Sequence, residues 1–362
     1  MAASTGIKKV AEYAGVSIGT VSKVLNPGTS ANNIRFSNET REKVLQAARM
    51  LNYQPSYGAK LLRGEKTQTI GFAVSLPGDH NFSFLSDYTF RLLNGIGQKA
   101  KERNYQVLLL NGVDYRHFLD VRRLDALILT GFAPERNPYA AEQRTLYSHF
   151  NERNYPFAVM HGHEADDGET PVARFGTDNR SGMRQIAELL ARRGIEEAGF
   201  IGELTSNPQF DHLERLALLR GELAARGIRL REESVIVRSG GDVPDRPRMG
   251  NYSEPDGMEA LDILLARKAL PRAVVCGNDN IAMGVLKRAH DLGLKVPEEL
   301  GIIGCDDAPW SKFLHPGLTT LHQPLEKLGA AAVEFVLEKR LHPEMENRSM
   351  QMEPVLVERE SV

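Results

Sequence analysis

Short apolar segments alternate with amphipathic helical segments from residue 69 onward, and this alternation constrains the fold more than any other feature. Segments typical of strands include "TIGFAVSL", "QVLLLNG", "LDALILTGF", "YPFAVMHG", "EAGFIGEL", "AVVCGNDN" and "LGIIGCDD". Segments typical of helices include "FRLLNGIGQKAKERNY", "SGMRQIAELLARRG", "RLALLRGELAARGI" and "IAMGVLKRAHDLG". Strands that alternate with helices form parallel sheets covered on both faces. Because roughly 290 residues is long for one such sheet, the pattern predicts two lobes.

A different pattern precedes this body, in "GIKKVAEYAGVSIGTVSKVLNPG". Apolar residues at helical spacing over 7–14 predict a short helix that ends at Gly15. Ser17 suits the N-cap of a second helix, whose apolar stripe contains Val21 and Val24. "NPG" then ends that helix. Two short helices joined by a tight turn with glycine predict a helix-turn-helix motif.

A third helix follows, with Ser37 as its N-cap and an apolar stripe of Val44, Leu45, Ala48 and Leu51. It would complete a three-helix core. The next segment, 55–69, reads "PSYGAKLLRGEKTQT" and is too short to form a stable helix alone. We expect it to fold only when a partner orders it.

Charge is distributed unevenly along the chain. Residues 1–66 hold ten Lys and Arg against four acidic residues, whereas the rest of the chain is acidic. A small basic head on an acidic body indicates a polyanionic partner. No secretory signal or membrane-spanning segment is evident, so no membrane partner is expected. Cys276 and Cys305 are too few for a disulfide framework; they suit small buried residues in a reducing cytoplasm.

Five motifs resemble the LacI/GalR family of transcriptional regulators. "VAEYAGVSIGTVSKVLN" is similar to its helix-turn-helix signature, and "NYQPSYGAKLLRGEKT" to its hinge. "FGTDNRSGMRQIAELLARRG", "GNDNIAMGVLKRAHDLGLKVPEELGIIGCDDAP" and "PGLTTLHQPLEKLGAAAVEFVLE" are similar to its core. The resemblance covers essentially the whole chain. It implies an N-terminal all-α helix-turn-helix domain and an α/β periplasmic-binding-protein-like core of two doubly wound parallel-sheet lobes.

The resemblance also implies domain boundaries. The head would span 1–54, the hinge helix or linker 55–68, and the effector-binding and dimerisation core 69–362. Within the core, the N-lobe would comprise about 69–179 and 323–352, and the C-lobe about 180–322 and 353–362. No heptad repeat follows "LVERESV", so a homodimer is expected rather than a tetramer.

The family implies a palindromic double-stranded DNA operator. At the matched base-reading positions, Ile18 can contact a thymine methyl group and Lys23 can donate to guanine, whereas Gly19 has no side chain to read with. Lys23 also lacks the bidentate fork of arginine. In the hinge, Leu62 matches the leucine that wedges into the minor groove. The implied DNA-binding residues are Ser17, Ile18, Gly19, Thr20, Ser22, Lys23, Asn26, Tyr57, Lys60 and Leu62.

Effector contacts are implied near strand ends, where ligands bind in such folds. Arg215 and Asn278 match the family's ligand-clamping residues, and Asp306 matches their acidic partner. Together they suit paired sugar hydroxyls, which both donate and accept hydrogen bonds. Further matched positions are Phe82, Phe84, His163 and Tyr252. The expected ligand is a small sugar-like effector, with no cofactor and no metal.

Other interpretations have less support in the sequence. His161, His163 and Glu164 could form a metal site, but no further Cys/His cluster accompanies them. Asp306 and Asp307 could be catalytic carboxylates, yet no nucleophile–base pair is evident, so an enzyme is not expected. A solute-binding protein would share the body but would have no use for a basic head.

Three questions stay open at the level of sequence. The expected function is a repressor of carbohydrate metabolism or transport genes, and a ligand-dependent activator or a corepressor-type regulator stays as the alternative. "NPGTSANNIRF" is longer than the family's usual link between helices, and its Arg35 could contact phosphate or simply lie in a solvated loop. Asp178 and Asn179 suit a helix cap better than a ligand site.

Overall fold

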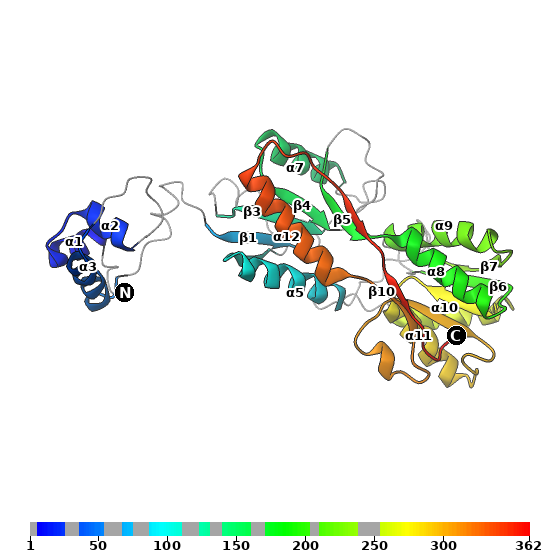
Figure 1. The fold of residues 1–362 in the computed structure, drawn as a ribbon. Helices are drawn as coiled ribbons and strands as arrows, with labels where there is room; N and C mark the ends of the chain where they lie inside the picture. Colours follow the sequence, from blue (N-terminus) through cyan, green and yellow to red (C-terminus); the bar gives the residue numbers. More distant parts are fainter. Residues whose placement is uncertain are drawn as a thin grey trace. The chain divides into compact units, whose positions relative to one another are not determined.

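The structure, a computed structural model, divides the chain into two compact units. Helices α1 to α3 belong to the first unit, and every element from β1 onward belongs to the second (Figure 1). The described residues are 6–25, 36–53, 67–74, 87–110, 123–130, 140–160, 171–202, 210–237 and 254–362.

Three short helices form the first unit: α1 (Ile7–Ala14), α2 (Ile18–Leu25) and α3 (Asn38–Met50). α1 ends at Gly15, whose φ of 65° is left-handed, as the sequence predicts. Ser17 Oγ accepts a 3.1 Å hydrogen bond from the amide of Thr20, so it satisfies one of the free amides at the start of α2. Ser37 caps α3 in the same way.

One fully buried valine from each helix contributes to the core of this unit: Val10, Val21 and Val44 are each 0% exposed. Val24, Ala11, Ala47 and Ala48 complete the buried cluster. Because the buried residues of α2 all face α1 and α3, its other side is left for solvent or a partner.

The second unit contains two six-stranded sheets. The first has the order β11-β5-β4-β3-β1-β2, and every pairing in it is parallel. Its strands are β1 (Thr69–Ala73), β2 (Gln106–Leu110), β3 (Ala126–Thr130), β4 (Phe157–Met160), β5 (Arg174–Thr177) and β11 (Met350–Met352).

Helices α5 (Asp87–Glu102) and α12 (Leu325–Leu341) pack side by side on the first sheet, although they lie far apart in the sequence (Figure 1). A Cβ at Gly95 would overlap the main-chain oxygen of Glu326, so only glycine permits this close approach. α7 (Ala140–Glu152) also belongs to this part of the unit, where its Phe150 contacts Phe157 of β4.

The second sheet has the order β12-β10-β9-β8-β6-β7. Its strands are β6 (Glu197–Ile201), β7 (Arg229–Ile236), β8 (Ala273–Cys276), β9 (Gly301–Asp306), β10 (Thr319–His322) and β12 (Val355–Val357). Around it lie α8 (Asn179–Arg192), α9 (Phe210–Ala224), α10 (Glu254–Ala266), α11 (Asp279–Asp291) and a 3₁₀ turn (Ser311–Phe313).

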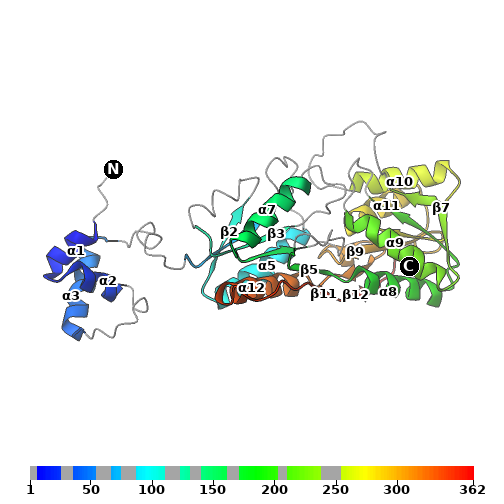
Figure 2. The same ribbon diagram turned by 90° about the horizontal axis from the view of Figure 1, so that it is seen from above.

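Two separate apolar clusters show that both faces of this sheet are covered. One joins α8 and α9 to residues such as Phe200 and Ile303, and the other joins α10 and α11 to Ile201 and Ile302. The helices accordingly lie on opposite sides of the strands in Figure 2. Cys276 and Cys305 are free thiols buried in these clusters.

The expected fold class is confirmed, with one difference of detail: β12 runs antiparallel to β10. The chain also passes between the two sheets more than once. It enters α8 after β5, returns to α12 after β10, and then places the consecutive strands β11 and β12 in different sheets. Among the described helices, none combines the length and the apolar character needed to cross a bilayer.

Candidate functional sites

The first candidate site is the free side of α2. Ser17, Ile18 and Gly19 are exposed at its start, with Ile18 48% exposed despite being apolar. Lys23 is half-buried one turn later. Thr20 and Ser22 are also half-buried, and the Oγ atoms of Ser17 and Thr20 lie 2.9 Å apart. A helix held by its apolar stripe and exposed at its N-terminus has the geometry with which a recognition helix enters the major groove.

Several candidate DNA-binding residues lie outside the described residues: Asn26, Tyr57, Lys60 and Leu62. The longer link over 27–35 lies outside them as well. The same holds for four candidate effector residues, Phe82, Phe84, His163 and Tyr252, and for the His161–Glu164 segment considered as a metal site. Among the residues that are described, no group of three or more His, Cys, Asp or Glu side chains could hold a metal ion.

The second candidate site lies at the carboxyl ends of β8 and β9. Arg215 of α9 is 5% exposed, and its Nη1 donates a 2.5 Å hydrogen bond to the carbonyl of Gly277, directly after β8. Its Nε donates to Oδ1 of Asn179 at 3.0 Å. These two bonds fix the guanidinium next to Asn278, which follows Gly277 in the chain.

Asn278 also stabilises the start of α11. It is the N-cap of α11, and its Oδ1 accepts a 2.8 Å hydrogen bond from the amide of Ile281. Asp178 similarly caps α8 through a 3.0 Å bond from Ser181, so the expected cap is confirmed there.

Asp306 ends β9 and brings a carboxylate to this edge of the sheet. Burial raises its pKa to about 6, while the charge of Arg215 acts in the opposite direction. Its Oδ1 accepts a 2.6 Å hydrogen bond from Nε2 of Gln323. The structure thus gathers Arg215, Asn278 and Asp306 at one strand edge, although they lie far apart in the sequence.

Asp307, the other carboxylate of this turn, is already ion-paired. It accepts from Nη2 of Arg359 at 2.6 Å and lies 2.9 Å from Nδ1 of His322. These partners lower its pKa despite the opposing effect of burial. A paired, low-pKa carboxylate is a poor general acid, which argues against a catalytic role for Asp307.

Sequence reasoning missed several polar residues around this site. Asp279 is 1% exposed and receives hydrogen bonds from Thr320 and Ala308 beneath the strand ends. Arg91 and Gln323 approach Asp306 from α5 and from the segment after β10. No local pattern marks these residues, because their partners lie tens or hundreds of positions away.

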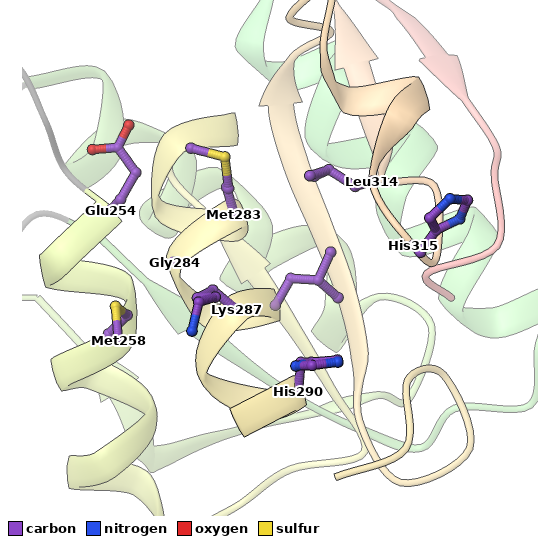
Figure 3. Close-up of a pocket in the computed structure, with 9 residues that line it drawn as sticks. Glu254, Met258, Met283, Gly284, Lys287, His290, Leu314 and His315 are labelled. Atoms are coloured by element: carbon purple, nitrogen blue, oxygen red, sulfur yellow. The ribbon is translucent and has the colours of Figure 1, made fainter. Parts of the chain in front are cut away.

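A cavity of about 390 Å³ lies elsewhere, against α10 and α11 (Figure 3). Its apolar lining comes from Met258, Met283, Leu286 and Leu314. Figure 3 shows Lys287, His290 and His315 around the same space. None of the candidate effector residues lines this cavity.

Comparisons with known proteins agree with both units. The family model described as "Bacterial regulatory proteins, lacI family" matches residues 6–56, and the model described as "Periplasmic binding protein-like domain" matches residues 187–362. The HTH-type transcriptional repressor PurR of Erwinia tasmaniensis is 31% identical over 98% of this chain and 96% of its own. The chain belongs to the lacI family of bacterial regulatory proteins.

Other relatives and solved structures extend the comparison of this lacI-family chain. PurR of Pasteurella multocida is 30% identical over 98% of both chains. The Lac repressor dimer bound to operator and the anti-inducer ONPF shares 23% identity and a TM-score of 0.79, covering 99% of both chains. A CelR–cellobiose complex shares 24% identity and a TM-score of 0.65, covering 99% of this chain and all of that one. At these identities the two structures show the fold alone.

The family membership decides between the function classes considered above. This lacI-family chain is a DNA-binding transcriptional regulator and not an enzyme. The similarity to the PurR proteins runs through the helix-turn-helix head as well as the core, so the solute-binding alternative is wrong.

Proposed function

We propose that this protein is a cytoplasmic, homodimeric transcriptional repressor of carbohydrate metabolism or transport genes, controlled by a small sugar-like effector. The observation that carries the proposal is the convergence of Arg215, Asn278 and Asp306 at the carboxyl ends of β8 and β9. An arginine, an amide and a carboxylate provide the mixed donors and acceptors that vicinal hydroxyls require. The choice of a repressor over an activator is supported by the PurR relatives, which are described as transcriptional repressors.

On the DNA side, each head would read one half of a palindromic operator. Ile18 would contact a thymine methyl group and Lys23 a guanine, with Ser17, Gly19, Thr20, Ser22 and Asn26 near the same groove. The segment 55–68 would act as the hinge, with Tyr57 and Lys60 on the DNA and Leu62 as a minor-groove wedge. Since Gly19 reads nothing, part of the specificity would come from how readily the operator bends.

Exposed apolar residues support the dimer. Phe313 is 72% exposed and directly precedes Leu314, which lines the cavity against α10 and α11; Phe90 of α5 and Leu108 of the edge strand β2 are also exposed. Exposed apolar side chains such as these are candidates for a protein interface. Edge strands with apolar side chains are rarely left uncovered. The Lac repressor neighbour is described as a dimer on its operator.

The effector proposal is tested by a thermal-shift screen of the full chain against sugars, sugar phosphates and free nucleobases. A ligand that binds only the folded state raises the melting temperature. We expect a sugar to stabilise the wild type and to lose this effect in Arg215→Gln and in Asp306→Asn. Stabilisation by a nucleobase alone would overturn the sugar class, and stabilisation that persists in both variants would place the effector elsewhere.

The sign of regulation needs a second experiment, because a ligand favours whichever state it binds more tightly. Operator DNA selected by the purified protein is placed before a reporter gene. Lower reporter output on expression of the protein supports repression. Higher output would make the protein an activator, and loss of binding without an added ligand would make that ligand a corepressor.

A further inference from the structure

Arg91 is a buried arginine of α5 whose guanidinium contacts the end of β9 and the segment that leads from β10 into α12. It is 9% exposed. Nη1 donates to the main-chain oxygen of Asp306 at 2.7 Å, and Nη2 donates to that of Gln323 at 2.6 Å. Nε and Nη2 donate to the carboxylate of Glu326 at 3.0 and 3.2 Å. Nη2 also lies 3.4 Å from Nε2 of His322.

The turn that Arg91 contacts has an unfavourable backbone. Asp306 has a φ of 137° and Asp307 a φ of 53°, both in the left-handed half of conformational space that side chains disfavour. Such conformations persist only where surrounding contacts hold them. Arg91 supplies one of these contacts at the carbonyl of Asp306, and Gln323 supplies another at its carboxylate.

Both of these contacts connect the Asp306 turn to elements of the first sheet. Arg91 belongs to α5, which packs on that sheet, and Glu326 belongs to the adjoining helix α12. Oε1 of the Gln323 side chain accepts a 2.6 Å hydrogen bond from the hydroxyl group of Thr177 at the end of β5. The orientation of a carboxylate on the second sheet is therefore set by groups attached to the first.

We propose that Arg91 is the positioning residue that holds Asp306 in its effector-binding orientation and transmits changes at Asp306 to α5. The inference rests on the proposed function, in which Asp306 contacts the effector. A guanidinium presents its donors in a rigid planar fork, so it can bond two carbonyls and a carboxylate at once. If the Asp306 turn moves, the fork cannot keep all three bonds, and α5 must respond.

Hydrogen–deuterium exchange on the ligand-free full chain tests this coupling without knowledge of the effector. Asp306→Asn removes the carboxylate charge near Arg215 and Arg91. In an otherwise wild-type chain we expect it to raise amide exchange in α5, over residues 88–96, by about threefold or more. In an Arg91→Gln background the same substitution should leave exchange in α5 unchanged, because the connection is gone.

Arg103→Gln provides a matched control directly after the same helix, which ends at Glu102. Substitution of Arg103 removes the same charge, but Arg103 forms an exposed ion pair with Glu334 of α12. The response of α5 to Asp306→Asn should survive in this background. Loss of the response in Arg103→Gln as well would show that any weakening of α5 has the same effect, and would overturn the proposal.

Arg91→Lys separates geometry from charge. Lysine keeps the positive charge but cannot reach the two carbonyls and the carboxylate together. We expect it to uncouple α5 from Asp306 as Arg91→Gln does; full coupling in Arg91→Lys would mean that charge alone acts. If Arg91→Gln fails to fold, the comparison with Arg91→Lys decides the question by itself.

The test of Arg91 and the test of the proposed function can fail separately. An unchanged α5 on Asp306→Asn in the wild-type background overturns the role of Arg91, even if the ligand screen places a sugar at Asp306. A coupled α5 supports the connection between Asp306 and α5; if the ligand screen then places the effector elsewhere, the proposed effector site fails and the connection remains.

Discussion

The amide of Ala308 donates a 2.8 Å hydrogen bond to Oδ2 of Asp279, a carboxyl group that is 1% exposed. Burial first, and then the charge of Asp306, raise the pKa of Asp279 to about 8. An aspartate in the unfolded chain titrates near pH 4. Between these values the folded state holds a proton that the unfolded state has released. The free energy of unfolding therefore falls as the pH rises through this window.

Asp279→Asn should reduce this dependence. One titrating group contributes a slope of up to about 1.4 kcal/mol per pH unit, and the asparagine variant lacks that contribution. Urea unfolding of wild type and variant between about pH 5 and 8 measures the two slopes. Asp262→Asn, at an exposed carboxylate paired with Arg288, is the control for the removal of one carboxylate. Equal slopes in wild type and Asp279→Asn would contradict the assignment.

Gly95→Ala should destabilise the second unit by about 1–3 kcal/mol, since the added methyl group overlaps the main chain of Glu326 and forces α5 away from α12. Gly97 lies on the same helix, and a Cβ there meets nothing within 4 Å. Gly97→Ala should therefore be neutral or stabilising by up to about 1 kcal/mol. Denaturant unfolding distinguishes the two; similar effects at both positions would refute the close-packing explanation.

Lys23→Ala should relax the base preference at one position in each operator half-site, because Lys23 would donate to a base edge. Selection of bound sequences from a random DNA pool measures this preference. Lys43→Ala removes the same charge from α3, where Lys43 pairs with Glu39, and should leave the selected sequence unchanged. If Lys23→Ala weakened binding to every sequence equally, Lys23 would be a phosphate contact.

Leu62→Ala should weaken binding to operator far more than binding to unrelated DNA, since a wedge acts only where a base step is opened. Titration of both DNAs by fluorescence anisotropy at one salt concentration measures the ratio. Equal losses on the two DNAs would remove the wedge from the mechanism.

Phe313→Asp should shift the protein from dimer to monomer, because a charge would replace an apolar side chain that is 72% exposed. Sedimentation velocity over a concentration series reports the change. Leu341→Asp, at a 63% exposed position near the end of α12, is the control and should leave the dimer intact. A dimer that survives Phe313→Asp would place the interface elsewhere.

The elements that could be predicted from sequence are those whose signals are local. Gly15, Ser17 and Ser37 act through bonds within a few residues, so the boundaries of α1, α2 and α3 follow from them. The fold class was also predictable, because the buried strands are short apolar runs between amphipathic helices.

Elements stabilised by distant partners were missed. β7 reads "RLREESVI", and its arginines form ion pairs across to Glu197 of β6 at one edge of the sheet. β11 and β12 are each three residues long and exist only because β5 and β10 pair with them. In the candidate effector site, Arg91 looked like an ordinary polar position of a helix, since its acceptors lie more than 200 residues away.

The split between β11 and β12 has a consequence for synthesis on the ribosome. One edge of β5 pairs only with residues 350–352, and one edge of β10 pairs only with residues 355–357. Until residues 350–357 emerge, both sheets carry an unpaired strand edge that could join another nascent chain. Completion of the two sheets is therefore nearly simultaneous, and a truncation before residue 350 would leave both unfinished.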